Sequence, residues 1–478
     1  MKRLVTCCII LFLLFCLFLP SRESLAKPDI ESTLDNYVET FLGTHRIPGA
    51  AIAIVQDRET IYAKSWGVTG GSEEAVTLET PFLIGSVTKS LTALAIVKLL
   101  DENKIMLDDP VQAHLPWFTL QDRAAATQIT IRHLLAHTSG LSTYTGLAIA
   151  DQGSADENAI VSHVRNLATE ELTADPGEQH QYSNANYLIL GALVEEVSGQ
   201  PFSEYMKQQI FSSLGMEHAA ADHVTAARNG YLGSYQSWFG FPVKSRVSYD
   251  NGGTPYGYIA ASAEDIASFI KFLQGNGPND FLTEESLSFY LSPLVQQREN
   301  RYYGFGLRLT TFDSGETMIW HSGATPDSRA ELFILPEHKW GGVILTNKNH
   351  RLEEEAVTHL REGIIQILHG EQPLQVPKKL PTIQWIMIGL LFMLLIRFVS
   401  LLKTMKSNST RKNISWRIWG LTSILFAILL IPILNYSVHA PWHTITVFTP
   451  DVAWLTIFTV ILLSLNGLAS IYVSLRKG

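Results

Sequence analysis

Ser86 is followed three residues later by Lys89, and these two residues could form a nucleophile and its base. An apolar segment ends at Ile84-Gly85, and the apolar residues that follow predict a helix over 86–100. Residues three apart share one face of a helix, so the two side chains are expected to be neighbours. A lysine amine kept neutral by burial can take the proton of a serine hydroxyl and make it a nucleophile. The positive end of the helix dipole would also favour negative charge beside this serine.

Two later stretches could share a site with this pair. Tyr182-Ser183-Asn184 follows a Pro-Gly break and is expected in a loop that leads into a helix from Leu188. His321-Ser322-Gly323, followed by Ala324, ends one predicted strand just before another begins. It is this combination that singles out Ser86, because Ser-x-x-Lys alone is weak evidence.

Together the three stretches resemble the motifs of the penicillin-binding-protein and class C β-lactamase superfamily of serine hydrolases. That superfamily uses Ser-x-x-Lys, then Tyr-x-Asn, then a Lys/His-Ser/Thr-Gly triplet on a strand, and the order and spacing are the same here. The segments 133–141 and 303–307 and Asn347 add to a resemblance that covers Asp29 to about Leu368. It implies a β-lactamase/D,D-peptidase-like α+β fold, in which helices flank an antiparallel sheet and an all-α region is inserted.

The resemblance also implies the roles of single residues. Ser86 is the nucleophile that forms an acyl-enzyme, and Lys89 and Tyr182 share the work of the general base. Asn184 binds the substrate amide and helps to hold Lys89. The backbone N–H groups of Ser86 and Ala324 form the oxyanion hole, which stabilises the negative charge of the transition state. The superfamily chemistry needs no metal and no cofactor.

The third motif departs from the β-lactamases, which usually have lysine where this chain has His321. A neutral imidazole recognises a substrate carboxylate less well than an ammonium does. Histidine here, followed by Ser322 and Gly323 in the substrate-binding strand, resembles D,D-peptidases and D-amino-acid peptidases of the superfamily. Beyond the motif, Arg329 could meet a substrate carboxylate or form a surface ion pair with Asp327 or Glu331.

Several of these residues also have plainer interpretations. Ser268–Lys271 repeats Ser-x-x-Lys within a predicted amphipathic helix over 263–273, where no catalytic role is needed. Tyr182 could be a core tyrosine at a loop–helix junction, and Tyr249-Asp250-Asn251 repeats the second motif without the helix that should follow it. His137 is interpreted as a structural histidine of a loop.

Strands at both ends of the outer domain, with helices between them, predict one antiparallel sheet and an inserted helical region. The predicted strands span 49–56, 60–68, 303–310, 318–321, 330–335 and 342–346. Helices are expected over 29–45 and 353–368, and the region 86–293 is mainly helical.

The first 26 residues have the pattern of a secretory signal peptide. Lys2 and Arg3 precede an apolar run, and the segment closes on Ser24-Leu25-Ala26, which suits cleavage; an uncleaved anchor is the alternative. All 3 cysteines lie in this leader. The mature chain therefore has no disulfide, thiolate metal site or cysteine nucleophile.

The predicted outer domain, 27–372, is joined by a linker at 373–382 to a membrane domain at 383–478. Three apolar segments, 383–402, 418–438 and 452–475, are long enough to span a bilayer. Five Lys and Arg lie between the first two spans and none lies at 439–451, so the positive-inside rule puts that basic loop and the C-terminus in the cytoplasm. A buried core of three helices is the alternative.

Residues 27–380 carry 25 Lys and Arg against 43 Asp and Glu, a net charge of −18 that makes nucleic acid a poor partner. The outer domain followed by three spans resembles membrane-anchored peptidases that remove an acyl-D-amino-acid cap from exported peptides. The implied substrate is a small peptide or acyl-D-amino acid, with a neighbouring transporter as a further possible partner. An esterase or a weak β-lactamase is the alternative enzyme. A sensor of β-lactams or wall peptides is the alternative of another class, against which the short inner loop counts.

Overall fold

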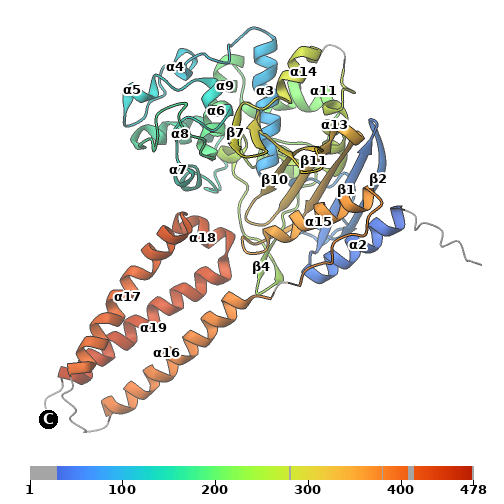
Figure 1. Ribbon diagram of the computed structural model, residues 1–478. Helices are drawn as coiled ribbons and strands as arrows, with labels where there is room; N and C mark the ends of the chain where they lie inside the picture. Colours follow the sequence, from blue (N-terminus) through green and yellow to red (C-terminus); the bar gives the residue numbers. More distant parts are fainter. Residues whose placement is uncertain (1–29, 279–280, 379, 407–413, 476–478) are drawn as a thin grey trace, which may run out of the picture.

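The computed structural model of the protein describes residues 30–278, 281–378, 380–406 and 414–475. The predicted signal peptide lies outside these residues, as does part of the basic loop between the first two predicted spans. Described residues before 379 form a part built of a sheet and helices, which we call the outer part. Three long helices extend together from it (Figure 1).

An eight-stranded antiparallel sheet runs through the outer part in the order β2-β1-β12-β11-β10-β9-β8-β7. The N-terminal hairpin joins the C-terminal strands, because β1 pairs with β12 and places Ala50 opposite Thr346. This arrangement confirms the predicted α+β fold with an antiparallel sheet, although the described residues also form a three-stranded and a two-stranded sheet that were not predicted. The strands are β1 (Gly49–Gln56), β2 (Glu59–Gly67), β7 (Val295–Arg298), β8 (Arg301–Gly304), β9 (Leu307–Thr311), β10 (Thr317–Ala324), β11 (Arg329–Leu335) and β12 (Trp340–Thr346).

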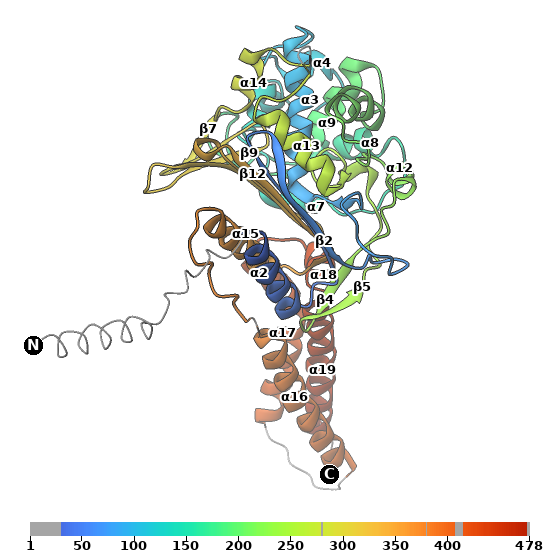
Figure 2. The same cartoon turned by 90° about the vertical axis from the view of Figure 1, so that its right-hand side faces the viewer.

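Helices cover both faces of the sheet (Figure 2). On one face, α2 (Ile30–His45) and α15 (Glu354–Leu368) bury apolar residues such as Phe41 and Leu360 against Phe333 of β11. On the other face lie the larger core and the inserted helical region. Its helices are α3 (Thr88–Asp101), α4 (Val111–His114), α5 (Arg123–Ala126), α6 (Ile131–Leu135), α7 (Thr143–Ala148), α8 (Ala159–Asn166), α9 (Asn184–Ser198), α10 (Phe202–Tyr205), α11 (Ser212–Leu214), α12 (His223–Arg228), α13 (Ala263–Leu273) and α14 (Glu284–Tyr290).

The predicted strand over 303–310 is wrong, because the chain turns within it. β8 ends at Gly304, and Phe305 and Gly306 take positive φ angles of 50° and 74° before β9 begins. A Cβ on Gly306 would overlap the carbonyl group of Lys89, so this tight turn packs directly on the start of α3. The glycine is needed both for the backbone angle and for the close approach.

Other boundaries also differ from the prediction. The helix expected from Leu188 begins at Asn184, so the second motif lies at its N-terminus. Short strands went unpredicted because two to four residues give too little pattern to identify a strand. They are β3 (Phe82–Leu83), β4 (Tyr235–Trp238), β5 (Phe241–Lys244), β6 (Ala260–Ala261), β7 and β13 (Lys348–Asn349).

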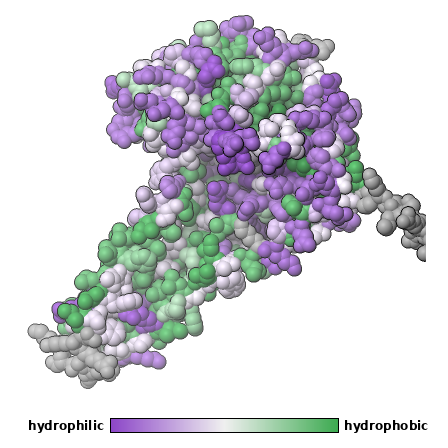
Figure 3. All heavy atoms as spheres, viewed as in Figure 1, coloured by the Kyte–Doolittle hydropathy of each residue, from purple (hydrophilic) through white to green (hydrophobic). Residues whose placement is uncertain are grey.

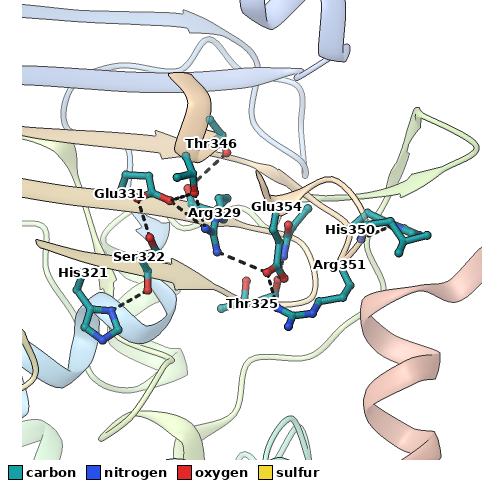
Figure 4. Close-up of polar contacts among 12 residues, drawn as sticks. His321, Ser322, Thr325, Arg329, Glu331, Thr346, His350, Arg351 and Glu354 are labelled. Carbon is teal, nitrogen blue, oxygen red and sulfur yellow. Dashed lines mark hydrogen bonds and ion pairs between the residues drawn. The ribbon is translucent and has the colours of Figure 1, made fainter. Parts of the chain in front are cut away.

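Arg329 does not form the surface ion pair that was one of its two expected roles; it forms a buried one. Its Nη2 lies 2.9 Å from Oε1 of the fully buried Glu331, while Oε2 of Glu331 receives Arg361 Nη1 at 2.7 Å. The Ser322 hydroxyl donates to the same carboxylate at 2.7 Å. Figure 4 shows how this cluster joins the third motif to the adjoining strand. Asp327, the other expected partner, receives a hydrogen bond from Thr325 instead.

Three helices beyond residue 381 are long and apolar enough to cross a membrane: α16 (Thr382–Lys406), α17 (Ile414–Val438) and α19 (Pro450–Leu475). Each predicted span lies within one of them. α19 packs against both others, and Asn466 of α19 donates to the Leu394 carbonyl of α16 at 3.0 Å. Figure 3 shows the apolar surface that these helices present, in contrast to the polar outer part. A short helix, α18 (Trp442–Phe448), was not predicted.

We expect Glu331→Ala to lower the free energy of unfolding of the outer part by about 3–5 kcal/mol, because buried Arg361 loses its partner at 2.7 Å and buried Arg329 keeps only Glu354, 3.7 Å away. Arg351→Ala is the matched control, since it removes an ion pair to Glu354 whose arginine is 70% exposed and should cost under about 1 kcal/mol. Denaturant unfolding of the detergent-solubilised protein measures both. Equal losses in the two variants would contradict the buried-cluster account.

Candidate active site

Ser86 lies in a 3-10 turn, Gly85–Val87, that leads into α3. Gly85 has a φ of 53°, and the Val87 N–H closes the turn by donating to the Ile84 carbonyl at 3.2 Å. The turn presents Ser86 at the end of α3, while Lys89 in the first turn of that helix is fully buried. The expected neighbourhood of the two side chains is observed, with Lys89 Nζ 3.1 Å from Ser86 Oγ.

The hydrogen bonds of Lys89 define what its amine can do. Nζ lies 2.9 Å from Asn184 Oδ1 and 2.7 Å from the Tyr256 carbonyl oxygen, and both of these atoms only accept. A neutral amine has two N–H donors and one lone pair. With both donors used, the lone pair is left for the hydroxyl proton of Ser86.

The surroundings of Lys89 favour this neutral form. Complete burial lowers the pKa of Lys89 well below its ordinary value, and the positive charge of Arg308 lowers that pKa further. The negative charge of Asp151 acts weakly in the opposite direction. A lysine buried in this way can serve as a base at neutral pH, which an exposed lysine cannot.

Tyr182 lies in the loop just before α9, and Asn184 is the first residue of that helix. The Tyr182 ring centroid is 5.0 Å from Lys89 Nζ, so the second motif reaches the Ser86–Lys89 pair. Burial raises the pKa of Tyr182 to about 12, against the opposing effects of Arg308 and of the nearby Ser86 hydroxyl, although the phenol oxygen has no hydrogen-bond partner among the described residues. The phenol therefore keeps its proton at neutral pH and can donate it.

His137 holds this loop in place, in line with the structural interpretation of that residue. Its Nδ1 accepts from the Ser183 backbone N–H at 3.2 Å and from Asn186 Nδ2 at 2.9 Å. Its ring centroid lies 4.4 Å from that of Tyr182. The remaining nitrogen, Nε2, lies 3.2 Å from the Tyr303 hydroxyl. Tyr249-Asp250-Asn251 is instead used to cap a short turn, with Asp250 accepting from Gly252 N–H.

The third motif approaches Ser86 through two glycines. A Cβ on Gly85 would overlap the backbone nitrogen of Ala324, and a Cβ on Gly323 would overlap the Ile84 carbonyl and lie 3.1 Å from the nitrogen of Ser86. Strand β10 can therefore lie against the Ser86 turn only because both residues lack a side chain. This contact puts the backbone nitrogens of Ser86 and Ala324 in the same small region.

His321 is buried and presents an acceptor. Its Nδ1 lies 2.7 Å from the Ser322 carbonyl oxygen, which only accepts, so Nδ1 carries the proton and Nε2 does not. Among the described residues Nε2 has no hydrogen-bond partner. Burial lowers the pKa of His321 well below its ordinary value, and the positive charge of Arg308 adds to this effect. The imidazole is therefore neutral and cannot donate from Nε2 to a carboxylate.

Arg308 is a cation beside this site that the sequence motifs did not identify. The guanidinium carbon lies 5.3 Å from the Tyr182 ring centroid and 5.5 Å from that of Tyr303. Its Nη1 donates to Gln297 Oε1 at 3.1 Å, and Gln297 Nε2 lies 3.0 Å from His180 Nε2. In the sequence, the only sign of Arg308 was its position directly after the 303–307 segment. The turn at Gly306 is what brings this position beside the site.

Two groups of side chains among the described residues could each hold a metal ion: Glu316 with His338 and His369, and Glu79 with His218 and Glu264. Neither group includes a residue of the three motifs.

The inserted helical region meets the sheet at a serine, a buried lysine, a tyrosine and a strand that carries a glycine. This combination is typical of one class of serine hydrolases. Residues 34–365 match the family described as Beta-lactamase, and the chain belongs to this family. Family members with this fold are serine hydrolases.

Relatives and solved structures agree with this assignment. Protein flp of Staphylococcus aureus (strain COL) is 28% identical over 340 residues, covering 70% of this chain and 67% of that protein. Penicillin-binding protein 4* of Bacillus subtilis (strain 168) is 27% identical over 370 residues, covering 74% and 79%. An octameric penicillin-binding protein homologue from Pyrococcus abyssi has a TM-score of 0.63 at 25% identity, covering 73% of this chain and 79% of that one. EstCE1, a hydrolase with promiscuous acyltransferase activity, shares the fold with a TM-score of 0.57 at 22% identity, covering 68% and 95%.

We expect Gly323→Ala to lower the acylation rate of Ser86 by about 100-fold or more, the typical cost of losing one oxyanion-hole donor. The added methyl group must push β10 away from the Ile84 carbonyl and so displace the Ala324 N–H. Gly43→Ala in α2 is the control, because its Cβ would meet nothing within 4 Å. The rate of labelling by a fluorophosphonate measures the effect, and an unchanged rate in Gly323→Ala would contradict it.

Proposed function

We propose that this protein is a membrane-anchored, extracytoplasmic serine hydrolase that cleaves amide bonds next to D-amino acids through an acyl-enzyme on Ser86. The observation that carries the proposal is the position of Lys89, whose buried Nζ lies within hydrogen-bond distance of Asn184 Oδ1, of the Tyr256 carbonyl oxygen and of Ser86 Oγ. This arrangement supplies a neutral base directly at a nucleophile.

Acylation then proceeds from these contacts. Ser86 Oγ attacks the carbonyl carbon as its proton passes to Lys89 Nζ, and the N–H groups of Ser86 and Ala324 stabilise the oxyanion. The phenol of Tyr182 gives its proton to the leaving amine and is restored by the proton held on Lys89. The C–N bond breaks, which leaves an ester on Ser86. Water hydrolyses that ester with Lys89 again as base.

His321 supports the preference for amides over β-lactams. A β-lactam presents a carboxylate beside the reacting ring, and a fixed cation at this strand position favours its recognition. A neutral imidazole with an accepting Nε2 offers no such donor, although an accepting nitrogen suits an N–H group of a peptide. Asn184, whose Oδ1 is bound to Lys89, keeps its amide N–H groups for a substrate carbonyl.

Ser86→Ala tests the proposed nucleophile. We expect it to abolish both amide hydrolysis and fluorophosphonate labelling, because the hydroxyl that faces Lys89 is gone. Intact-mass analysis and peptide mapping of the labelled protein measure this, with Ser268→Ala as the control for the other Ser-x-x-Lys within the outer domain. Labelling that persists at another serine in Ser86→Ala would overturn the assignment.

His321→Lys tests the proposed substrate class. The wild type should show a higher kcat/KM for acyl-D-aminoacyl amides than for penicillins or cephalosporins. Hydrogen bonds to charged groups contribute about 1.5–3 kcal/mol, so the substitution should shift the ratio of kcat/KM toward substrates with a free carboxylate by about 10- to 150-fold. Efficient cephalosporin hydrolysis by the wild type, with no D-amino-acid amide accepted, would exclude the peptidase and support the β-lactamase alternative. Turnover of simple esters alone would support the esterase alternative.

The membrane orientation is a further part of the proposal. The ends of α16 and α17 that flank the basic loop lie far from the outer part, whereas α18 lies beside it (Figure 1). A reporter enzyme that works only outside the cytoplasm should therefore be inactive when fused after Lys412 and active when fused after Leu374. Activity of the first fusion would contradict the orientation.

A further inference from the structure

Asp451 is the single acidic residue of the chain beyond residue 380, and it is buried in the first turn of α19. Each of its two carboxylate oxygens has two hydrogen-bond partners. Oδ2 receives the backbone N–H of Phe239 at 2.9 Å and Gln384 Nε2 of α16 at 3.0 Å. Oδ1 receives the backbone N–H of Val452 at 2.7 Å and lies 2.9 Å from His350 Nε2. One carboxylate thus joins two apolar helices to the outer part.

His350 is the point at which this carboxylate meets the catalytic sheet. The Leu352 N–H donates to His350 Nδ1 at 3.2 Å, so Nε2 carries the proton and donates it to Asp451. His350 is buried and directly follows the short strand β13. In Figure 4 it lies next to a helix of the C-terminal part of the chain.

Asn349, the neighbour of His350, holds the end of the oxyanion strand. Its Nδ2 donates to the Thr325 carbonyl at 2.6 Å, and Thr325 directly follows Ala324. Thr325 also closes the turn between β10 and β11, because its N–H donates to the Ser328 carbonyl at 3.0 Å. Four successive hydrogen-bonded or covalent links therefore separate the α19 carboxylate from Ala324, and they run through the buried residues His350, Asn349 and Thr325.

Further contacts fix the same junction. The Arg351 N–H donates to the Phe448 carbonyl at 3.0 Å, and Gln236 Nε2 donates to the Val447 carbonyl at 2.6 Å. These bonds attach α18 to β4 and to the segment after β13. The helices beyond residue 381 are thus packed into the outer part, which a simple tether would not require.

We propose that Asp451 is a positioning residue for catalysis, which holds the His350–Asn349 segment and, through the Thr325 carbonyl, the Ala324 N–H of the oxyanion hole. The apolar helices are then part of the catalytic framework as well as its anchor. Removal of the carboxylate leaves the buried donors of Phe239, His350 and Gln384 unpaired, and such groups shift to find other partners. A shift of the segment releases the Thr325 turn.

The inference rests on Ser86 as the proposed nucleophile, and the experiment separates the two. Full-length wild-type protein in lipid nanodiscs is first labelled with a fluorophosphonate, whose phosphoryl oxygen occupies the oxyanion hole. If Ser86 is not labelled, the proposed function fails. If it is labelled, we expect Asp451→Ala to slow labelling by about 10- to 100-fold, the range that small misplacements of a catalytic group cause.

A double-mutant cycle distinguishes positioning from a general loss of packing. Asn349→Ala should slow labelling to a similar extent, and Asp451→Ala with Asn349→Ala should be no slower than the slower single variant. Gln236→Ala removes a bond of the same junction outside this route and should leave the rate near that of the wild type. Equal rates in Asp451→Ala and the wild type, or losses that multiply in the double variant, would overturn the proposal. If Asp451→Ala does not fold, Asp451→Asn and His350→Gln, which keep part of the hydrogen bonding, carry the same comparison.

Discussion

The rest of this structure holds the buried amine of Lys89 in short contact with the hydroxyl of Ser86. Burial makes the neutral form of Lys89 stable enough to accept a proton, and it also demands that both amine N–H groups be paired. Asn184 from α9 and the Tyr256 carbonyl meet that demand. Three segments that are far apart in the sequence must therefore meet at one nitrogen atom. They meet on the face of the sheet that carries the inserted helical region.

The proposed oxyanion hole consists of backbone N–H groups, and packing positions the backbone that carries them. Gly85 and Gly323 allow the Ser86 turn and β10 to touch, while Glu331 ties Ser322 of that strand to two buried arginines. At the end of β10 the bonds through Asn349 and His350 reach a carboxylate on an apolar helix. Strand β10 is thus held by the Ser86 turn, by the Glu331 cluster and by the bonds that lead to Asp451 of α19. Preorganised N–H groups of this kind stabilise a transition state because they need not move when charge develops.

Much of this could be predicted from the sequence, since the three motifs and the long apolar segments are local patterns. The sheet followed from strands at both ends of the outer domain, α13 from periodicity, and the three long helices from the length of their apolar segments. Local patterns could not reveal Arg308, whose side chain reaches the site only after the unpredicted turn at Gly306, nor the burial of Arg329, which depends on Arg361 and Glu354 of a distant helix. No sequence pattern indicated the role of Asp451, apart from its being the single acidic residue beyond residue 380. The partners that join it to other elements lie 67 to 212 positions away in the chain.

The protonation state of Lys89 is the most direct test of the account. Side-chain NMR of protein carrying isotope-labelled lysine, with Lys89→Arg to assign the signal, follows the ε-methylene of each lysine as the pH changes. Lys89 should titrate well below the ordinary lysine value, and acylation of Ser86 should be lost in parallel as Lys89 gains its proton. An ε-methylene that titrates near the ordinary lysine value of 10.5, with acylation already fast at pH 7, would show that Lys89 is not the neutral base and would contradict the account.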